Sequence, residues 1–417
     1  MIKEILFAET QHYKGDVDPT FIDLAHHFSR LQDARNQQGG AALVVYFQGQ
    51  KVVDIYTGKK SQQEDWQSDT LAVCYSTGKG ILSTLAHILV SEGLLEYDLP
   101  VAHYWAEFAQ NGKANITLRH ILCHQSGLFD VRHLIEDASE MLNWSHMLEL
   151  MAAATPRFAA GQEAAYQALT YGWLLGGVIE KATKQTLSEL MQHYLVQPLE
   201  LNGAYFGTPS SELGRVARIL EKPKTSSQAK PQHKKSNTPR KASLSEKLLE
   251  LSGQSPQDFQ DAMIPKGMRH FSFHADQSLQ AVIPAANGVF TADSLARVYA
   301  MLAKQGQWSG RQLIRPEVFK QLSIIQSKAR DRVMPIPMHW RLGYHRVLTL
   351  GKRVPNGFGH VGINGSGAWC DVTRELSFAY THNFNITSAT GDYRLWGLSQ
   401  ETLRCADALL NGRKGWF

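Results

Sequence analysis

Strand-forming segments lie at both ends of this chain, with helical periodicity between them, and this arrangement constrains the fold more than any other feature. Residues 41–47 (AALVVYF) and 51–58 (KVVDIYTG) are rich in β-branched and aromatic side chains around Gln48-Gly49, which predicts an antiparallel hairpin. Residues 367–373 (GAWCDVT) and 376–383 (LSFAYTHN) predict a second hairpin. We therefore expect one sheet assembled from both termini.

Helical patterns flank and separate these hairpins. Asp18-Pro19 predicts the start of an N-terminal amphipathic helix, and residues 395–409 predict a last helix with Gly412 as its cap. Further patterns fall at 81–89, 145–154, 172–200 and 292–304. The expected fold class is α/β, an antiparallel sheet flanked by terminal helices, with a mostly helical inserted domain. The expected domains are 1–75 with 285–417 for the sheet, and 76–284 for the helices.

The net charge of +5 does not indicate a nucleic-acid partner. Residues 222–241 hold seven basic residues and no acid, so the rest of the chain carries about −2. The same segment contains no large apolar side chain, which predicts a solvated loop, with a basic tail for an acidic partner as the alternative. We expect no nucleic-acid function.

The four cysteines have no C-x-x-C spacing, which argues against a disulfide framework and a zinc ribbon. The first residues, MIKEILFAETQHYKGD, lack the apolar run of a signal peptide. No stretch approaches the roughly 18 apolar residues of a membrane span. A cytoplasmic enzyme is the expectation; the oligomeric state is not readable from the sequence.

Ser76-Thr77-Gly78-Lys79 opens the 81–89 helix and puts a hydroxyl and an amine on one helical face. The amine can assist deprotonation of the serine, and the helix N-terminus favours a developing anion. The pattern alone is weak, because Ser227-Gln228-Ala229-Lys230 repeats it inside the basic loop. The alternative is an N-cap serine followed by a solvated lysine.

Tyr166 precedes the apolar helix near Gly172 and is a candidate base. A phenol with a pKa near 10 is about one part in a thousand ionised at pH 7, so a phenolate requires a pKa lowered by roughly two to three units. The ammonium of Lys79 in contact would lower it. The alternative is a core tyrosine with a satisfied hydroxyl.

His360-Val361-Gly362 lies in a glycine-rich stretch directly before the C-terminal strands. Glycines allow close backbone approach, so a strand amide here and the amide of Ser76 could form an oxyanion hole. The alternative is a glycine-rich loop with a turn histidine.

His120 and His124, four residues apart, could ligate zinc. However, the glutamate of an H-E-x-x-H motif is missing, and a structural hydrogen bond is the favoured interpretation.

The order Ser-X-X-Lys, Tyr-X-X, His-X-Gly resembles the class C β-lactamase-like serine hydrolases, a family that includes penicillin-binding proteins and family VIII carboxylesterases. The likeness runs nearly end to end and includes ITLRHILCHQSGL (116–128), YGWLLGGVIE (171–180), QPLELN (197–202), NGVFTADSLARVYAML (287–302) and FGHVGINGS (358–366). The resemblance implies a β-lactamase/transpeptidase-like fold. It implies Ser76 as nucleophile, Lys79 as its helper, Tyr166 as base or proton shuttle, and the amides of Ser76 and Ile363 as oxyanion donors.

Two departures from that family pattern favour uncharged esters. The second motif reads Tyr166-Gln167-Ala168 where β-lactamases and peptidases usually have asparagine third, and the third motif reads His360-Val361-Gly362 in place of Lys-Thr-Gly. Ala168 offers no side-chain amide to an amide substrate. His360, with an ordinary pKa near 6.5, offers no fixed positive charge to a substrate carboxylate.

The sequence thus predicts a serine hydrolase that acts through an acyl-enzyme, a carboxylesterase on small or short-chain esters, with no cofactor and no metal. A β-lactamase or D-alanyl peptidase, an acyltransferase, and a non-catalytic binding protein of the same fold remain the alternatives. No G-x-S-x-G elbow, G-x-G-x-x-G fingerprint or P-loop is present, which disfavours an α/β-hydrolase or a nucleotide enzyme.

Overall fold

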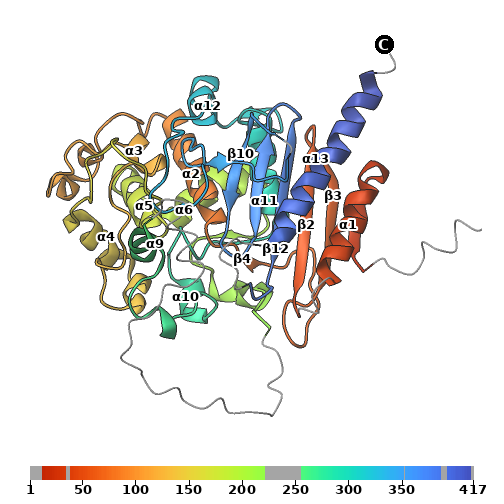
Figure 1. The fold of residues 1–417 in the computed structure, drawn as a ribbon, viewed down its shortest axis with the longest axis horizontal. Helices are drawn as coiled ribbons and strands as arrows, with labels where there is room; N and C mark the ends of the chain where they lie inside the picture. The colour runs from red at the N-terminus through yellow and green to blue at the C-terminus, as the bar shows by residue number, and fades with distance from the viewer. Residues whose placement is uncertain (1–11, 34–37, 221–254, 352, 387–391, 415–417) are drawn as a thin grey trace, which may run out of the picture.

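The computed structural model describes residues 12–33, 38–220, 255–351, 353–386 and 392–414 (Figure 1). Its main sheet has seven strands in the order β1-β3-β2-β12-β11-β10-β9. Both predicted hairpins are confirmed, as β2 (Gly40–Phe47) with β3 (Gln50–Gly58) and β11 (Gly367–Asp371) with β12 (Leu376–His382). They join where β2 pairs antiparallel with β12, from Phe47 opposite Leu376 to Ala41 opposite His382. The sheet is therefore built from both ends of the chain.

The other strands are short. β1 (Lys14–Val17) pairs with β3 at one edge, and β10 (Gly357–Val361) and β9 (His345–Arg346) complete the other edge. β4 (Ala72–Val73), β6 (Val289–Phe290) and β5 (Ala204–Tyr205) form a three-stranded sheet, and β7 (Gln307–Trp308) pairs with β8 (Arg311–Gln312). No sequence pattern marks β1 or β9, because these strands are too short to show alternation.

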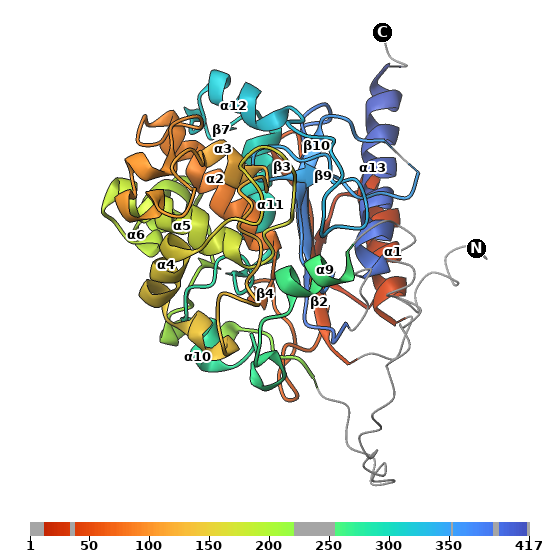
Figure 2. The same ribbon diagram turned by 60° about the vertical axis from the view of Figure 1, so that its left-hand side comes forward.

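Terminal helices cover one face of the main sheet (Figures 1 and 2). α1 (Ile22–Asp33) follows a 3₁₀ turn at Pro19–Phe21, where the Asp18 carboxylate accepts the Thr20 N–H at 2.9 Å, so the predicted N-terminal cap is confirmed. α13 (Tyr393–Lys414) packs against α1. α13 continues past Gly412, so that predicted cap is wrong, because a helical glycine costs only about 1 kcal/mol and does not end a helix by itself.

α11 (Ala292–Ala303) and the mostly helical part of the chain cover the other face (Figure 1). The predicted pattern at 172–200 is broken into shorter helices because Lys184 takes a left-handed conformation with φ 59°. The α-helices of this part, with α12 from the C-terminal portion, are α2 (Thr77–Ser91), α3 (Leu118–Leu122), α4 (Trp144–Ala153), α5 (Thr170–Thr183), α6 (Leu187–Met191), α7 (Gln197–Leu199), α9 (Pro256–Met263), α10 (Asp276–Gln280) and α12 (Pro316–Ser323).

The 3₁₀ and π turns of this part are Val101–His103, Ala106–Ala109, Ala138–Leu142, Gln192–Val196, Ser210–Arg215 and Met268–His270.

The largest hydrophobic cluster spans β2, α2, α5 and α11, and every residue of α2 is buried. A buried α2 gives a rigid base for the residues at its N-terminus.

The predicted α/β class is confirmed, whereas the domain division at 75/76 and 284/285 stays a prediction. The basic segment 222–241 lies outside the described residues. Among the described helices, none has the length and apolar character needed to cross a membrane.

Candidate active site

Ser76 is the N-cap residue of α2, three residues after the end of β4 and directly after a strained residue. Tyr75 has φ 49°, a left-handed conformation that is uncommon for a bulky side chain and is held only where the surroundings fix it. Cys74 N donates to Gly288 O at 2.9 Å, and Thr77 Oγ1 donates to Ser366 O at 3.0 Å, so both sides of Ser76 are tied to distant segments. Ser76 itself is half-buried. The Ser76 hydroxyl therefore lies at the N-terminus of a helix whose backbone is held in place, and it is partly accessible to solvent.

Lys79 follows one turn later and is fully buried. Its Nζ lies 2.7 Å from Ala168 O, 2.9 Å from Ala285 O and 2.9 Å from Ser76 Oγ. Burial lowers the pKa of Lys79 well below its ordinary value, because the ammonium loses its water. The lysine–serine contact that the spacing predicts is present.

Tyr166 joins this pair from the loop before α5. Its hydroxyl hydrogen-bonds with the Ser76 side chain, and Lys79 Nζ lies 4.9 Å from the centre of its ring. Burial, the largest cause, raises the pKa of Tyr166 rather than lowering it. The lowered pKa that a phenolate requires is therefore not found: burial shifts the pKa of Tyr166 upward and that of Lys79 downward, and both shifts favour the uncharged forms.

Two residues that the sequence reasoning missed hold Tyr166 in place. Asp331, which is 2% exposed, accepts the Tyr166 N–H at 3.1 Å through Oδ1 and the Trp340 indole N–H at 3.0 Å through Oδ2. The Trp340 ring stacks on Tyr166 with 5.7 Å between centroids and 6° between planes. One carboxylate thus fixes both the backbone and the ring of Tyr166. No sequence motif marks Asp331, because its role depends on a contact 165 residues away.

The two histidines considered for zinc have separate structural roles. His120 completes a capping box with Thr117 at the start of α3. His124 is buried, its Nδ1 accepts the Gln167 N–H at 3.2 Å, and its ring packs edge-on against Tyr166 at 4.9 Å. The favoured structural interpretation agrees with these contacts, and His124 adds a third ring beside Tyr166.

The His360-Val361-Gly362 segment reaches the site from β10. The His360 ring lies 6.2 Å from the Tyr166 ring, and burial lowers its pKa well below the ordinary value, so the ring is neutral near pH 7. A Cβ on Gly362 would lie 2.5 Å from Cys74 O, so only glycine allows this close approach. Ile363 and Ser76 line the same cavity. The structure therefore brings all six residues predicted for the site, Ser76 included, into one neighbourhood.

The departures at the second motif have a structural explanation. Ala168 contributes its main-chain carbonyl to Lys79, so no side chain is needed at this position to hold the amine. Gln167 points elsewhere: its Oε1 accepts the Ser126 hydroxyl at 2.7 Å, and its side chain is fully buried. Neither residue presents a polar side chain to the cavity, which is lined at this point by Ala168 and Leu169.

A cavity of about 350 Å³ opens at Ser76. One side of it comes from residues 263–274. No sequence pattern marks this segment as part of a site, because its apolar residues follow no helical or strand period. The residues that line the cavity are Tyr75, Ser76, Ala168, Leu169, Met263, Met268, Phe271, Ser272, Phe273, His274, Ala285, Ala286 and Ile363.

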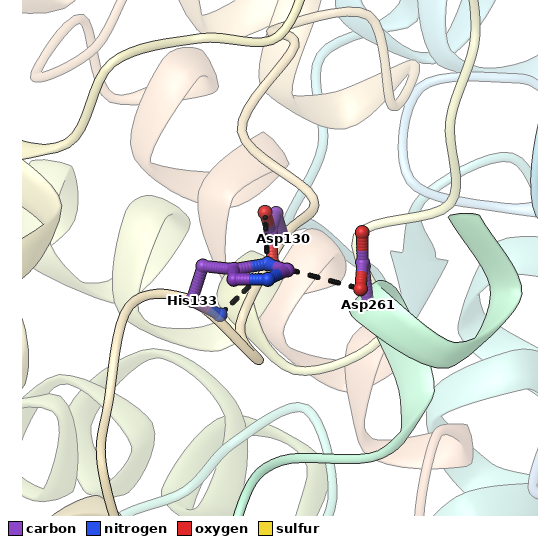
Figure 3. Close-up of side chains that lie close together, drawn as sticks. All are labelled: Asp130, His133 and Asp261. Atoms are coloured by element: carbon purple, nitrogen blue, oxygen red, sulfur yellow. Dashed lines mark hydrogen bonds and ion pairs between the residues drawn. The ribbon is translucent and has the colours of Figure 1, made fainter. Parts of the chain in front are cut away.

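Asp130, His133 and Asp261 form a second group of polar side chains (Figure 3). Their possible metal-binding atoms lie within 4.8 Å of one another. However, Arg157 Nη2 lies 2.6 Å from Asp130 Oδ2 and 3.0 Å from Asp261 Oδ2. A guanidinium already balances both carboxylates, so this group fits an ion-pair network better than a divalent cation.

Comparisons with known proteins agree with this geometry. A family model described as Beta-lactamase matches residues 24–400. The protein described as "Esterase/beta-lactamase LipL" from Mycobacterium tuberculosis is 34% identical over 373 residues, which is 88% of this chain and 82% of that protein.

Two solved structures resemble the chain along most of its length. The structure of a penicillin-binding protein homologue from Caulobacter crescentus superposes with a TM-score of 0.78 at 29% identity, covering 94% of this chain and 99% of the other. The structure of a family VIII carboxylesterase superposes with a TM-score of 0.79 at 27% identity, with the same coverage. The β-lactamase/transpeptidase-like fold is confirmed.

Proposed function

The chain belongs to the beta-lactamase family, and from this premise we propose that it hydrolyses small, uncharged carboxylic esters through an acyl-enzyme on Ser76. The coarse part, a hydrolase of the β-lactamase fold, follows from the family. The finer parts, namely the ester substrate and the roles of the site residues, are the proposal.

The main support for this proposal is the set of hydrogen-bond partners around Lys79 Nζ. A neutral amine has two N–H groups and one lone pair. The carbonyls of Ala168 and Ala285 can only accept, so they take the two N–H groups. The lone pair then faces Ser76 Oγ at 2.9 Å. Because burial also lowers the pKa of Lys79, the amine is prepared to take the serine proton.

In the first step Ser76 Oγ attacks the ester carbonyl while its proton passes to Lys79 Nζ. The carbonyl oxygen becomes an anion, which the main-chain N–H groups of Ser76 and Ile363 stabilise together with the N-terminus of α2. Contact between Gly362 and Cys74 supports this assignment, since it brings the two main chains close enough to share one oxygen.

Tyr166 supplies the proton for the leaving group. Its raised pKa keeps the phenol protonated, and its hydrogen bond to Ser76 puts the O–H at the reacting atoms. As the C–O bond breaks, the departing alkoxide takes the Tyr166 proton, and the phenolate regains a proton from the Lys79 ammonium. Water then attacks the acyl-enzyme and gives one proton to Lys79. As the bond between the acyl carbon and Ser76 Oγ breaks, the Lys79 ammonium returns that proton to Ser76, and the carboxylic acid leaves.

The chemistry of the cleft favours neutral esters over β-lactams. His360 is neutral, and Ala168 and Leu169 line the cavity where an amide-binding side chain would be needed. A substrate carboxylate therefore meets no fixed positive charge among the residues that line the described cavity.

The test combines mass and turnover. A small fluorophosphonate should add once to the wild-type protein, on Ser76, and not to Ser76→Ala. Thr77→Ser, one residue along, is the matched control and should label normally. Short-chain p-nitrophenyl esters should be turned over far better than a chromogenic cephalosporin.

The alternatives give different results. Efficient cephalosporin turnover without ester turnover would assign a β-lactamase, and capture of the acyl group by an added alcohol in preference to water would assign an acyltransferase. A protein that does not label although its cavity binds a small ester would be a non-catalytic binder. Each of these results contradicts the proposal.

A further inference from the structure

One side of the cavity at Ser76 is formed by Met263, Met268, Phe271 and Phe273, which we call the apolar wall. Met263 ends α9, and Met268 starts the 3₁₀ turn that leads to the two phenylalanines. Thioether and aromatic side chains bind apolar groups through contact area and ring contacts. The wall therefore presents apolar atoms to whatever occupies the cavity.

The apolar wall connects by ring contacts to the residue before the nucleophile. The Phe271 and Phe273 rings meet edge-on at 5.1 Å, and the Phe273 and Tyr75 rings meet edge-on at 5.9 Å. The Tyr75 hydroxyl also lies 3.0 Å from His274 Nε2. Because Tyr75 adjoins Ser76 in the chain, the wall lies at a defined position relative to the reacting hydroxyl.

The cavity contains no fixed charge within the described part of the chain. No lysine, arginine or carboxylate is among its lining residues. His274 is the lining residue that protonation could charge, and burial lowers its pKa to about 4, so it is neutral at pH 7. An anionic substrate that enters this space would lose water without gaining a partner.

The apolar wall is held at both ends, so it is a preformed surface. Asp261 O of α9 accepts the N–H groups of Val131 and Arg132 at 3.0 and 3.1 Å. At the other end His274 O accepts from Arg218 Nη1 at 2.7 Å, and Leu279 O accepts the Thr208 N–H at 2.7 Å. A preformed apolar surface binds a rigid group with little ordering cost.

We propose that the apolar wall is a subsite for one compact, uncharged apolar ring of the substrate, so that the preferred esters carry an aryl or similar ring. This inference rests on the proposed ester hydrolysis. A volume of about 350 Å³ lies near the lower end of the range of about 300–1,000 Å³ for small-molecule pockets, which suits one ring and not a long lipid chain. The ring can belong to the acyl group or to the alcohol.

Matched ester pairs distinguish these two placements. On the acyl side, p-nitrophenyl phenylacetate is compared with p-nitrophenyl acetate; on the alcohol side, benzyl acetate is compared with ethyl acetate. Each kcat/KM is divided by the rate of the same ester with hydroxide. A preference of roughly tenfold or more for the ring in either pair supports the subsite and identifies its side. No preference in both pairs overturns it.

Substitutions in the wall test which residues make the subsite. Phe271→Ala and Phe273→Ala should each reduce the ring preference by about fivefold or more. Ile324→Ala removes a side chain that is 54% exposed and outside the cavity lining, and should leave the preference unchanged. If an alanine variant fails to fold, Phe271→Leu keeps most of the volume and should still reduce the preference. A preference that survives in folded wall variants overturns the assignment.

Charge gives an independent gain-of-function test. Wild-type protein should prefer p-nitrophenyl valerate over the similarly sized p-nitrophenyl monoester of glutaric acid, which carries a carboxylate. Met268→Lys should reduce this preference about tenfold by supplying a cation. Leu350→Lys adds the same charge at a side chain that is 62% exposed and outside the cavity lining, and should not change it. Equal effects of both lysines would contradict a charge-free subsite at the wall.

Failure of this inference is distinguishable from failure of the ester mechanism. If Ser76 does not react with a small fluorophosphonate and no ester is hydrolysed, the proposed function fails. If Ser76 reacts and acetate esters are hydrolysed without any ring preference, only the apolar-wall subsite fails.

Discussion

Lys79 and Asp261 are both buried, but Lys79 has only neutral hydrogen-bond partners in the described contacts, whereas Asp261 has a cationic partner. Lys79, at 0% exposure, meets two main-chain carbonyls and a hydroxyl. Asp261, at 1% exposure, meets the guanidinium of Arg157 at 3.0 Å and the Gln257 side-chain amide at 2.6 Å. The first group is left without an opposite charge, and the second is balanced.

This difference separates the proposed reactive site from the ion-pair network. Burial without an opposite charge lowers the pKa of the Lys79 amine, because desolvation opposes protonation, and the proposed mechanism uses the lone pair that a neutral amine keeps. A balanced carboxylate is stabilised in its charged form by its partner, so it is a weak base. Residue types alone would favour the Asp130, His133 and Asp261 group as the reactive site, because two aspartates with a histidine resemble a metal or catalytic centre more than a single lysine does.

Removing the amine should produce the largest effect. Lys79→Met keeps the length of the side chain but has no lone pair for the Ser76 proton, so we expect acylation to slow by about 10³-fold or more. The rate of p-nitrophenylacetate acylation, measured by stopped flow, checks this. Circular dichroism verifies the fold. An acylation rate within tenfold of wild type would exclude Lys79 as the base.

Tyr166→Phe should reduce turnover by about 10²-fold, and more for poor leaving groups. Ethyl acetate needs a proton on its departing alkoxide, whereas p-nitrophenolate leaves without one. The ratio of the two kcat values, variant against wild type, isolates this role. Equal losses for both esters would mean that Tyr166 positions the substrate and does not protonate the leaving group.

The pH dependence should reflect the unbalanced lysine. Lys79 must be neutral to accept a proton, so kcat/KM falls tenfold per unit as pH drops through its lowered pKa, and levels off above it. Fluorophosphonate labelling rates across pH give this curve. His360 also has a lowered pKa, so His360→Asn is the control: it should keep the acid limb, and loss of the limb would move the assignment to His360.

Breaking the ion pair between Arg157 and Asp261 should lower the stability of the fold rather than the activity. Arg157→Met leaves the buried Asp261 carboxylate without its cation, and we expect the free energy of unfolding in urea to fall by about 1–3 kcal/mol. This lies below the usual cost of a broken buried pair because Arg157 is 46% exposed and partly screened by water. The double variant Arg157→Met with Asp261→Asn should recover part of the loss; no recovery would show that the pair is not the cause.

The smallest effect should come from His133. Its side chain is 56% exposed, and its Nδ1 lies 2.9 Å from Asp130 Oδ2 and 3.8 Å from Asp261 Oδ1, while Arg157 already balances both carboxylates, so His133→Asn should change the free energy of unfolding by about 0.5 kcal/mol or less. Isothermal titration with Zn²⁺ supplies the contrast. Strong Zn²⁺ binding to the wild-type protein that is lost in His133→Asn would identify this group as a metal site and contradict its assignment as an ion-pair network.

The sequence predicts the parts of this molecule that depend on local pattern. The two hairpins follow from alternating β-branched residues around short turns, and the Ser76–Lys79 contact follows from the helical repeat alone. Tyr166 and the His360 segment required more, namely a resemblance that extends over most of the chain. Their convergence on Ser76 depends on how the sheet and the helices pack.

The parts that sequence reasoning missed depend on tertiary contacts. Asp331 acts through Tyr166 and Trp340, and Phe271 and Phe273 line the cavity from a segment without periodicity. The pKa of Tyr166 was predicted in the wrong direction because residue types show an amine beside a phenol but not the absence of water around them. Burial decides which of the two groups keeps its proton.

The pairing of β2 with β12 has a consequence for when activity can begin. β2 gains its second neighbour only when residues 376–382 reach it, and β10, which leads into the proposed oxyanion donor Ile363, enters the same sheet through β11. A growing chain on the ribosome carries Ser76 and Lys79 long before it contains the strand that completes their cleft. Synthesis at about 5–20 residues per second leaves an interval of tens of seconds between the two. Under the proposed mechanism Ser76 lacks the main-chain donor of Ile363 during this interval, so we expect a nascent chain not to be acylated.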